Sequence, residues 1–285
     1  MLMKVYEILI KLFETFLSII RIIGHTSFRR TGEMARTSNA CLIIGNGPSL
    51  ISSLEKNKDK LKKTDLLAVN FMGLTPEFMI YRPNLYVLCD PGFWIESPDT
   101  VLSEKVRKLY QVLADTTNWD LQLYLPHDAR KSKFIKAILS SNKFIHVNYF
   151  NKTKIEGLRC FTYFTYSAQW GMPRAQNVLC AALMLCIYSG YKTIYLAGAE
   201  NDWIKNLWVD ANNRLRLDDL HFYDNTNQGN AIVINTKMYE QFLSWYYAFK
   251  SYAEIAAFAH NRGINVINTN LTSFIDVFEK QELID

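Results

Sequence analysis

The sequence predicts an α/β protein with a doubly wound, mostly parallel, Rossmann-like sheet. Short apolar runs alternate with longer helical patterns along most of the 285 residues, which is typical of parallel strands connected by helices. The strand candidates are apolar on both faces, as expected for strands covered by helices on both sides. Several of them end in Gly, Asn or Asp, which are residues that favour turns.

The composition is that of a folded globular protein. Hydrophobic residues make up 49% of the chain and charged residues 21%, which excludes a disordered chain. The net charge of +5 is mild, and without a basic arm it favours an anionic ligand or membrane surface over nucleic acid. The five Cys form no CxxC pair and do not cluster with the five His. We therefore expect buried free thiols, a reducing cytoplasmic environment and no metal site.

Residues 1–24 predict an amphipathic helix with an unusually narrow polar stripe. The polar residues recur at spacings of three and four, which places them on one side of a helix: Lys4, Glu7, Lys11, Glu14, Ser18 and Arg21. The charges exclude a transmembrane span, and the apolar centre of a signal peptide is missing.

Two interpretations of this helix stay open. It packs against the protein body or a second subunit, or it lies peripherally on the inner face of the cytoplasmic membrane through residues 1–36. Arg29, Arg30 and Arg36 would support the membrane interpretation. Residues 25–40 are polar and predict a linker, and 41–285 predict the folded domain.

The first half of this domain predicts five strands and one helix. The apolar run 41–45 predicts a buried strand, and the charged stretch 51–63 after it predicts a helix. Runs of β-branched, aromatic and other apolar residues predict further strands at 65–70, 84–90, 121–125 and 144–150.

The second half predicts helices alternating with two more strands. The strongly apolar stretch 174–189 predicts a helix ended by Gly190, and 191–198 predicts the clearest strand of the chain. A long helix is expected over 236–262, ended by Gly263, followed by a last strand at 264–268. No repeat or low-complexity segment interrupts this order.

The first candidate binding motif is GNGPSL, residues 45–50, directly after the first strand. Ligands of doubly wound sheets sit beyond the carboxyl ends of the strands. Gly45 and Gly47 would let a ligand approach the backbone, and Pro48 suits the first position of a helix whose free N–H groups attract an anion. Asn46 and Ser49 complete the loop. The alternative to a binding loop is that the motif forms only a tight strand-to-helix turn. It is not a Walker loop, because the Lys of that motif is absent.

Two further motifs follow the same logic. Arg174, Gln176 and Asn177 open the apolar helix, where they would hold a phosphate or carboxylate or merely cap the helix. The clearest strand ends in GAENDW, residues 198–203. Gly198, Glu200 and Asp202 there would face a ribose hydroxyl or a metal ion. Glu-x-Asp is only a loose match to the Asp-x-Asp of metal-dependent transferases.

His221 is the candidate general base. It stands in DDLHFYD, residues 218–224, among acidic and aromatic residues. A histidine titrates near neutrality, and a neighbouring carboxylate can orient its ring. The alternative is a structural histidine. His127 has a similar setting and is a weaker candidate.

These motifs, in this order, resemble the bacterial lipooligosaccharide sialyltransferases and the wider group of GNGPSL polysaccharide-biosynthesis proteins. IIGNGPSL is close to the opening motif of that family. The run 68–70 matches its second strand, 190–198 its Gly-Tyr-Lys strand, and 268–278 its closing segment. Asp90-Pro91 stands where the family has Asn-Pro. The resemblance covers roughly residues 41–280 in patches.

The resemblance implies an inverting, metal-independent glycosyltransferase that uses no cofactor. It would move sialic acid or a related sugar from a CMP-linked donor onto a cell-surface glycan or glycolipid acceptor. Asn70 and the loop at Asn46 would hold the nucleotide, His221 would act as the base, and a lid over about 200–230 would exclude water. The family's lid tyrosines are absent between Gly198 and His221. The resemblance also implies that the chain can form a homo-oligomer.

Two other functions stay open. One is a Mg²⁺-dependent diphosphotransferase of the pterin-kinase type, with Asp90, Glu200 and Asp202 as ligands. The other is a non-catalytic nucleotide-binding subunit that uses its N-terminal helix to hold a partner.

Overall fold

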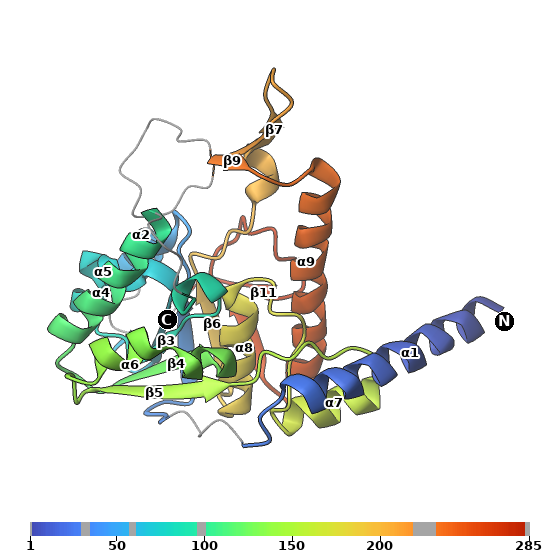
Figure 1. Cartoon of the computed structure of the whole chain (residues 1–285), viewed down its shortest axis with the longest axis horizontal. Coiled ribbons are helices and arrows are strands. Elements are labelled where there is room, and N and C mark those ends of the chain that lie inside the picture. Colours follow the sequence, from blue (N-terminus) through green and yellow to red (C-terminus); the bar gives the residue numbers. More distant parts are fainter. Residues whose placement is uncertain (1, 30–34, 57–60, 96–100, 219–231, 283–285) are drawn as a thin grey trace.

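The computed structural model describes residues 2–29, 35–56, 61–95, 101–218 and 232–282, and it confirms the predicted fold class. Eight parallel strands form the main sheet in the order β11-β10-β6-β1-β2-β3-β4-β5 (Figure 1). The strands are β1 (Ala40–Ile44), β2 (Asp65–Val69), β3 (Leu85–Val87), β4 (Leu121–Pro126), β5 (Ile145–Phe150), β6 (Thr193–Ala197), β10 (Asn265–Asn268) and β11 (Glu279–Lys280).

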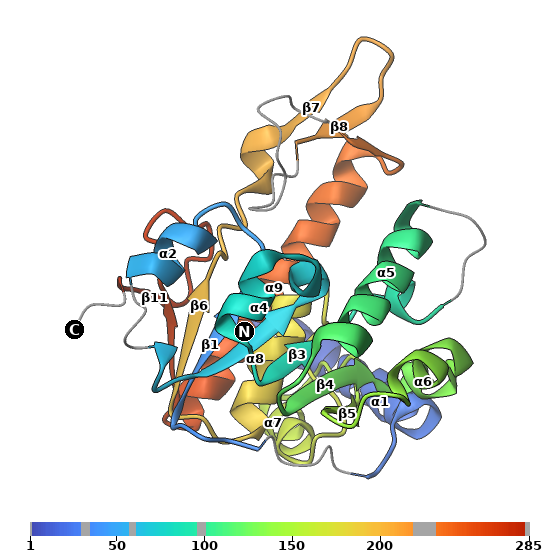
Figure 2. The ribbon, with the colours of Figure 1, turned by 90° about the vertical axis from the view of Figure 1, so that its left-hand side faces the viewer.

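Helices cover both faces of this sheet (Figures 1 and 2). On one face lie α2 (Leu50–Lys56), α4 (Pro76–Tyr81), α5 (Val101–Thr116) and α6 (Lys133–Leu139). On the other lie α7 (Arg159–Ser167), α8 (Val178–Tyr188) and α9 (Met238–Asn261). Successive residues of β1 alternate between the two cores, since Cys41 and Ile43 join one and Leu42 and Ile44 the other. Both faces are therefore buried, which explains why the strands read as continuous apolar runs.

Smaller elements complete the fold. Short 3-10 helices follow four of the strands: η1 (Asn70–Leu74), η2 (Pro91–Phe93), η3 (His127–Lys131) and η4 (Trp203–Asn206). A separate antiparallel sheet of β7 (Leu207–Val209), β8 (Leu215–Leu217) and β9 (Ile232–Ile234) projects above the N-terminal end of α9 (Figures 1 and 2). The N-terminal helix α1 (Leu2–His25) runs beside α7.

The sequence did not predict α4, α5, α6, α7 or the small antiparallel sheet. The segment of α7, RCFTYFTYS, is rich in Thr, Tyr and Phe, which prefer strands when considered alone. Burial of Thr162, Thr165 and Tyr166 on one side of the helix outweighs that local preference.

The predicted start of α8 is also wrong. The helix begins at Val178 rather than at 174, because the side chain of Asn177 accepts a hydrogen bond from the N–H of Cys180 and caps it. The residues before it form bends instead, with the N–H of Gln176 donating to the carbonyl of Arg174, and Met172 exchanges backbone hydrogen bonds with Thr153 and Ile155.

Gly45 lets the ends of β1 and β6 approach each other. Its N–H donates to the carbonyl of Ala197 at 2.8 Å, and a Cβ at Gly45 would lie 2.3 Å from the carbonyl oxygen of Gly198. Neither backbone can move without breaking the ladder between the two strands. We expect Gly45→Ala to lower the free energy of unfolding by about 3 kcal/mol, the upper end of what overpacking usually costs.

Urea unfolding checks this expectation, with Gly24→Ala as the matched control. A Cβ at Gly24 meets nothing within 4 Å, and Gly24 lies in α1, where Ala is the better helix former. The control should therefore keep or slightly raise the wild-type midpoint. Equal midpoints for Gly45→Ala and the wild type would contradict the close approach of β1 and β6.

Candidate functional site

A cavity of about 460 Å³ opens where the strand order reverses. β2 lies on one side of β1 and β6 on the other, so loops from both halves of the sheet meet there. The cavity is lined by residues that follow β1, β2, β3, β5 and β6 and by the first turn of α8. Most of the predicted binding residues lie on its wall: Gly45, Asn46, Gly47, Pro48, Asn70, Asp90, Gln176, Asn177, Gly198, Glu200 and Asp202.

The GNGPSL loop holds a side chain of the protein itself. The N–H of Ser49 donates to Oε1 of Glu200 at 2.8 Å, and the N–H of Gly47 donates to the carbonyl of Gly198 at 2.9 Å. A Cβ at Gly47 would lie 1.4 Å from Oε2 of Glu200, so Gly47 makes room for this carboxylate. Pro48 precedes α2, which begins only at Leu50, so its predicted place at the first helical position is wrong. Gly45 and Gly47 thus make room for other parts of the chain, namely Gly198 and Glu200.

Three oxygens of the cavity lining are buried and accept no hydrogen bond among the described residues. They are Oδ1 of Asn46, Oε2 of Glu200 and Oδ1 of Asp218. A buried acceptor without a donor costs roughly 1–3 kcal/mol. The protein itself covers these three atoms, so they do not lie on the surface of the cavity.

Another part of the wall suits an anion. Val178 and Leu179 open α8 on the cavity wall, and the first N–H groups of a helix lack acceptors within it. Lys152 also lines the cavity, with its Nζ donating to the carbonyl of Cys89 at 3.3 Å and lying 5.0 Å from the ring centroid of Trp94. Lys152 forms no ion pair among the described residues.

Cys89 lies beside this ammonium but is no nucleophile. Burial raises the pKa of the Cys89 thiol to about 11, although Lys152 works in the opposite direction. The thiol therefore stays protonated at neutral pH.

The predicted residues around the start of α8 shape the wall through contacts to α9. Asn177 uses its Oδ1 for the helix cap and donates from Nδ2 to the hydroxyl of Tyr252 at 2.7 Å. Asn201 donates to the same hydroxyl at 2.7 Å, and Gln176 donates to Oγ of Ser244. Burial raises the pKa of Tyr252 well above its ordinary value, so its hydroxyl is neutral.

The structure does not bring Arg174 or Ser49 to the cavity wall. The guanidinium of Arg174 lies 4.1 Å from the ring centroid of Tyr247 instead. Asp202, on the wall, pairs with Lys205 at 3.1 Å. His221 and the predicted lid beyond 218 lie outside the described residues. Within the described ranges, no group of three His, Cys, Asp or Glu side chains is arranged to hold a metal ion.

Sequence reasoning missed several residues of the wall, among them Lys152, Trp203 and Asp218. Lys152 stands two residues after the end of β5, so the rule that strand ends meet at one edge would have found it. Trp203 stacks on Trp245 with 6.2 Å between ring centroids and 18° between planes. That pair joins η4 to α9, and no local signal in the sequence predicts it.

No family model matches the chain, and no curated protein is similar to it. Among solved structures, it is similar to the MAf glycosyltransferase of Magnetospirillum magneticum AMB-1, with 11% identity and a TM-score of 0.48. The similarity covers 93% of this chain and 37% of that one, so the chain spans little more than a third of that protein's length.

Proposed function

We propose that this protein is a glycosyltransferase that binds a nucleotide-sugar donor in the cavity at the end of β1. The carrying observation is that one cavity, at the carboxyl ends of the strands, is lined both by Lys152 and by the N-terminus of α8. Ribose and sugar hydroxyls would form hydrogen bonds with polar side chains of the cavity wall such as Asn70 and Asp90. The donor phosphate would lie between Lys152 and the first turn of α8.

A CMP-linked donor is the finer part of this proposal. Lys152 is the single Lys or Arg on the described wall of the cavity, and the wall also carries Asp90, Glu200, Asp202 and Asp218. One ammonium and one helix N-terminus match the single charge of a phosphodiester better than the charges of a diphosphate. The resemblance to sialyltransferases suggests sialic acid or a related sugar, transferred to a glycan or glycolipid.

The proposed reaction is a single displacement with inversion. His221 would take the proton from the acceptor hydroxyl, whose oxygen attacks the anomeric carbon. The bond between that carbon and the phosphate oxygen breaks, and its electron pair leaves with CMP. Lys152 and the α8 N–H groups would stabilise the added charge on the departing phosphate. Asp218, three residues before His221 in the sequence, lines the cavity and supports this assignment.

A thermal-shift screen tests the donor class. CMP, CDP, UDP, GDP and ATP would each be added to the full chain, with and without Mg²⁺. A ligand at about 100 times its Kd should add about 2.7 kcal/mol to the stability. We expect stabilisation by CMP that does not depend on Mg²⁺. Stabilisation only by ATP or a diphosphonucleotide with Mg²⁺ would contradict the proposal and favour a diphosphotransferase.

A further inference from the structure

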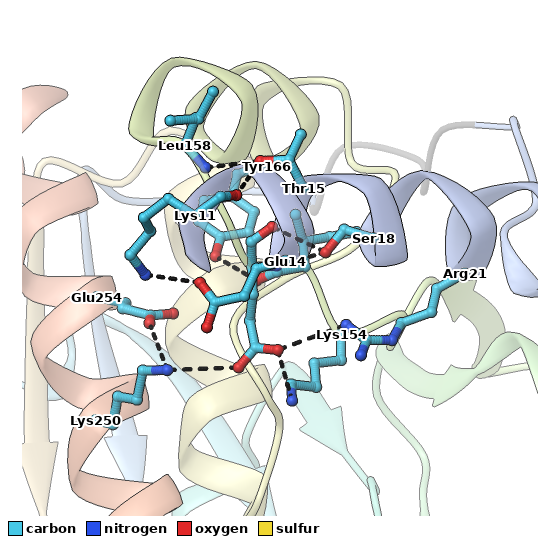
Figure 3. Close-up of polar contacts among 12 residues, drawn as sticks. Lys11, Glu14, Thr15, Ser18, Arg21, Lys154, Leu158, Tyr166, Lys250 and Glu254 are labelled. Carbon is cyan, nitrogen blue, oxygen red and sulfur yellow. Dashed lines mark hydrogen bonds and ion pairs between the residues drawn. The ribbon is translucent and has the colours of Figure 1, made fainter. Parts of the chain in front are cut away.

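Helix α1 contacts the protein through its polar stripe. The side chain of Ser18 is fully buried, and its Oγ donates to the carbonyl of Glu156 at 2.9 Å and accepts from the N–H of Glu156 at 2.8 Å. The Oγ1 of Thr15 accepts from the N–H of Leu158 at 2.9 Å. Gly157 fits between them, since a Cβ there would lie 2.1 Å from the Thr15 Oγ1. Figure 3 shows this contact between the helix and the segment that leads into α7.

The charges of α1 that face the body are already paired. The carboxylate of Glu156 forms ion pairs with Arg21 of α1 at 3.5 Å, with Lys154 at 2.6 Å and with Lys250 at 3.4 Å. Burial acts to raise the pKa of Glu156, but Lys154 and Lys250 outweigh it and hold this pKa below its ordinary value. Glu156 is therefore ionised at neutral pH, and its ion pair with Arg21 helps to hold the helix by its polar side.

The opposite side of α1 is apolar and exposed. Six large side chains between 12 and 23 share this face, with exposed fractions from 42% to 74%: Leu12, Phe13, Phe16, Ile19, Ile20 and Ile23. At 100° per residue they fall within an arc of about 120° on the far side of the helix from Ser18. Contiguous apolar surface of this kind marks an interaction site. The N-terminal end of α1 also projects beyond the rest of the molecule (Figure 1).

We propose that this outer face of α1 lies in the surface of an anionic lipid bilayer, with the helix in the plane of the membrane. Residues 1–36 carry six Lys and Arg against three Glu, a surplus that complements anionic headgroups. Lys4 and Arg29 are exposed near the two ends of the helix. The apolar arc is broader than the narrow seam that a coiled-coil partner would bury. None of the described helices is long and apolar enough to cross a membrane.

Vesicle sedimentation with the full chain tests this proposal, which does not depend on the donor cavity. The lipids are phosphatidylcholine mixed with phosphatidylglycerol, and phosphatidylcholine alone. We expect the wild type to bind the mixed vesicles and to lose binding as salt rises. The double variant Phe16→Glu with Ile20→Glu should bind at least ~10²-fold more weakly, because burying each large apolar side chain contributes ~10-fold or more.

The matched control is Ile80→Glu with Leu102→Glu, which adds the same charge at exposed apolar positions of α4 and α5. It should bind vesicles as the wild type does. Thermal unfolding of both variants should match the wild type, since the changed side chains are exposed. The proposal would be overturned if the Phe16/Ile20 variant bound the mixed vesicles as tightly as the wild type. It would also be overturned if the wild type bound neither kind of vesicle. If the wild type forms a dimer without lipid and the same variant is monomeric, the apolar face binds a second copy of the chain instead.

Discussion

Replacing His221 with Ala is expected to lower the turnover number by about 10²–10⁴-fold while donor affinity changes little. The loss follows from the proposed role, because an acceptor hydroxyl that keeps its proton is a weak nucleophile. The nucleotide would be held by the cavity wall around Asn46 and Lys152, which the substitution leaves intact. The measurement is kcat at saturating donor and acceptor, with the CMP thermal shift as the reading of donor binding.

His260→Ala is the matched control for this experiment. His260 is an exposed histidine in the last turn of α9 and does not line the cavity. Its substitution should leave both kcat and the thermal shift at the wild-type values. The low-pH limb of the pH–rate profile should disappear in His221→Ala and persist in the control. Unchanged turnover in His221→Ala would remove His221 from the mechanism.

The second large effect is expected from Lys152→Met. Methionine keeps much of the side-chain length and contact with Trp94 but removes the ammonium. A hydrogen bond to a charged group is worth about 1.5–3 kcal/mol, so affinity for CMP should fall about 10–10²-fold. The turnover number should fall as well, since the same charge would stabilise the departing phosphate. Titration with CMP and steady-state kinetics measure the two effects.

Lys192→Met controls for the loss of a positive charge as such. Lys192 is exposed and precedes β6, so it belongs to the edge of the sheet opposite the cavity. It should bind CMP as the wild type does. If Lys152→Met also binds CMP normally, the donor phosphate does not lie where we propose.

The sequence predicted those parts of the fold and the site that depend on local pattern. Strands buried on both faces must be apolar throughout, so the runs at 41–45, 65–70 and 191–198 identified β1, β2 and β6. Parallel strands carry their carboxyl ends to one edge, which is why Asn70, Asp90 and Gly198, each following a strand, line one cavity. Short helices such as α7 could not be predicted, because their burial rather than their propensity decides their conformation.

Only the tertiary structure decided which groups are available to a ligand. Gly47 looked like a place where a ligand approaches the backbone, yet Glu200, more than 150 residues later, takes that space and the N–H of Ser49. The polar stripe of α1 is periodic in the sequence, but its direction depends on Glu156, a residue distant in the chain. By itself the sequence determined most strands of the main sheet and the edge of the sheet at which the candidate site lies. The direction each polar group faces followed from long-range contacts, because a buried polar group takes its partner wherever the fold provides one.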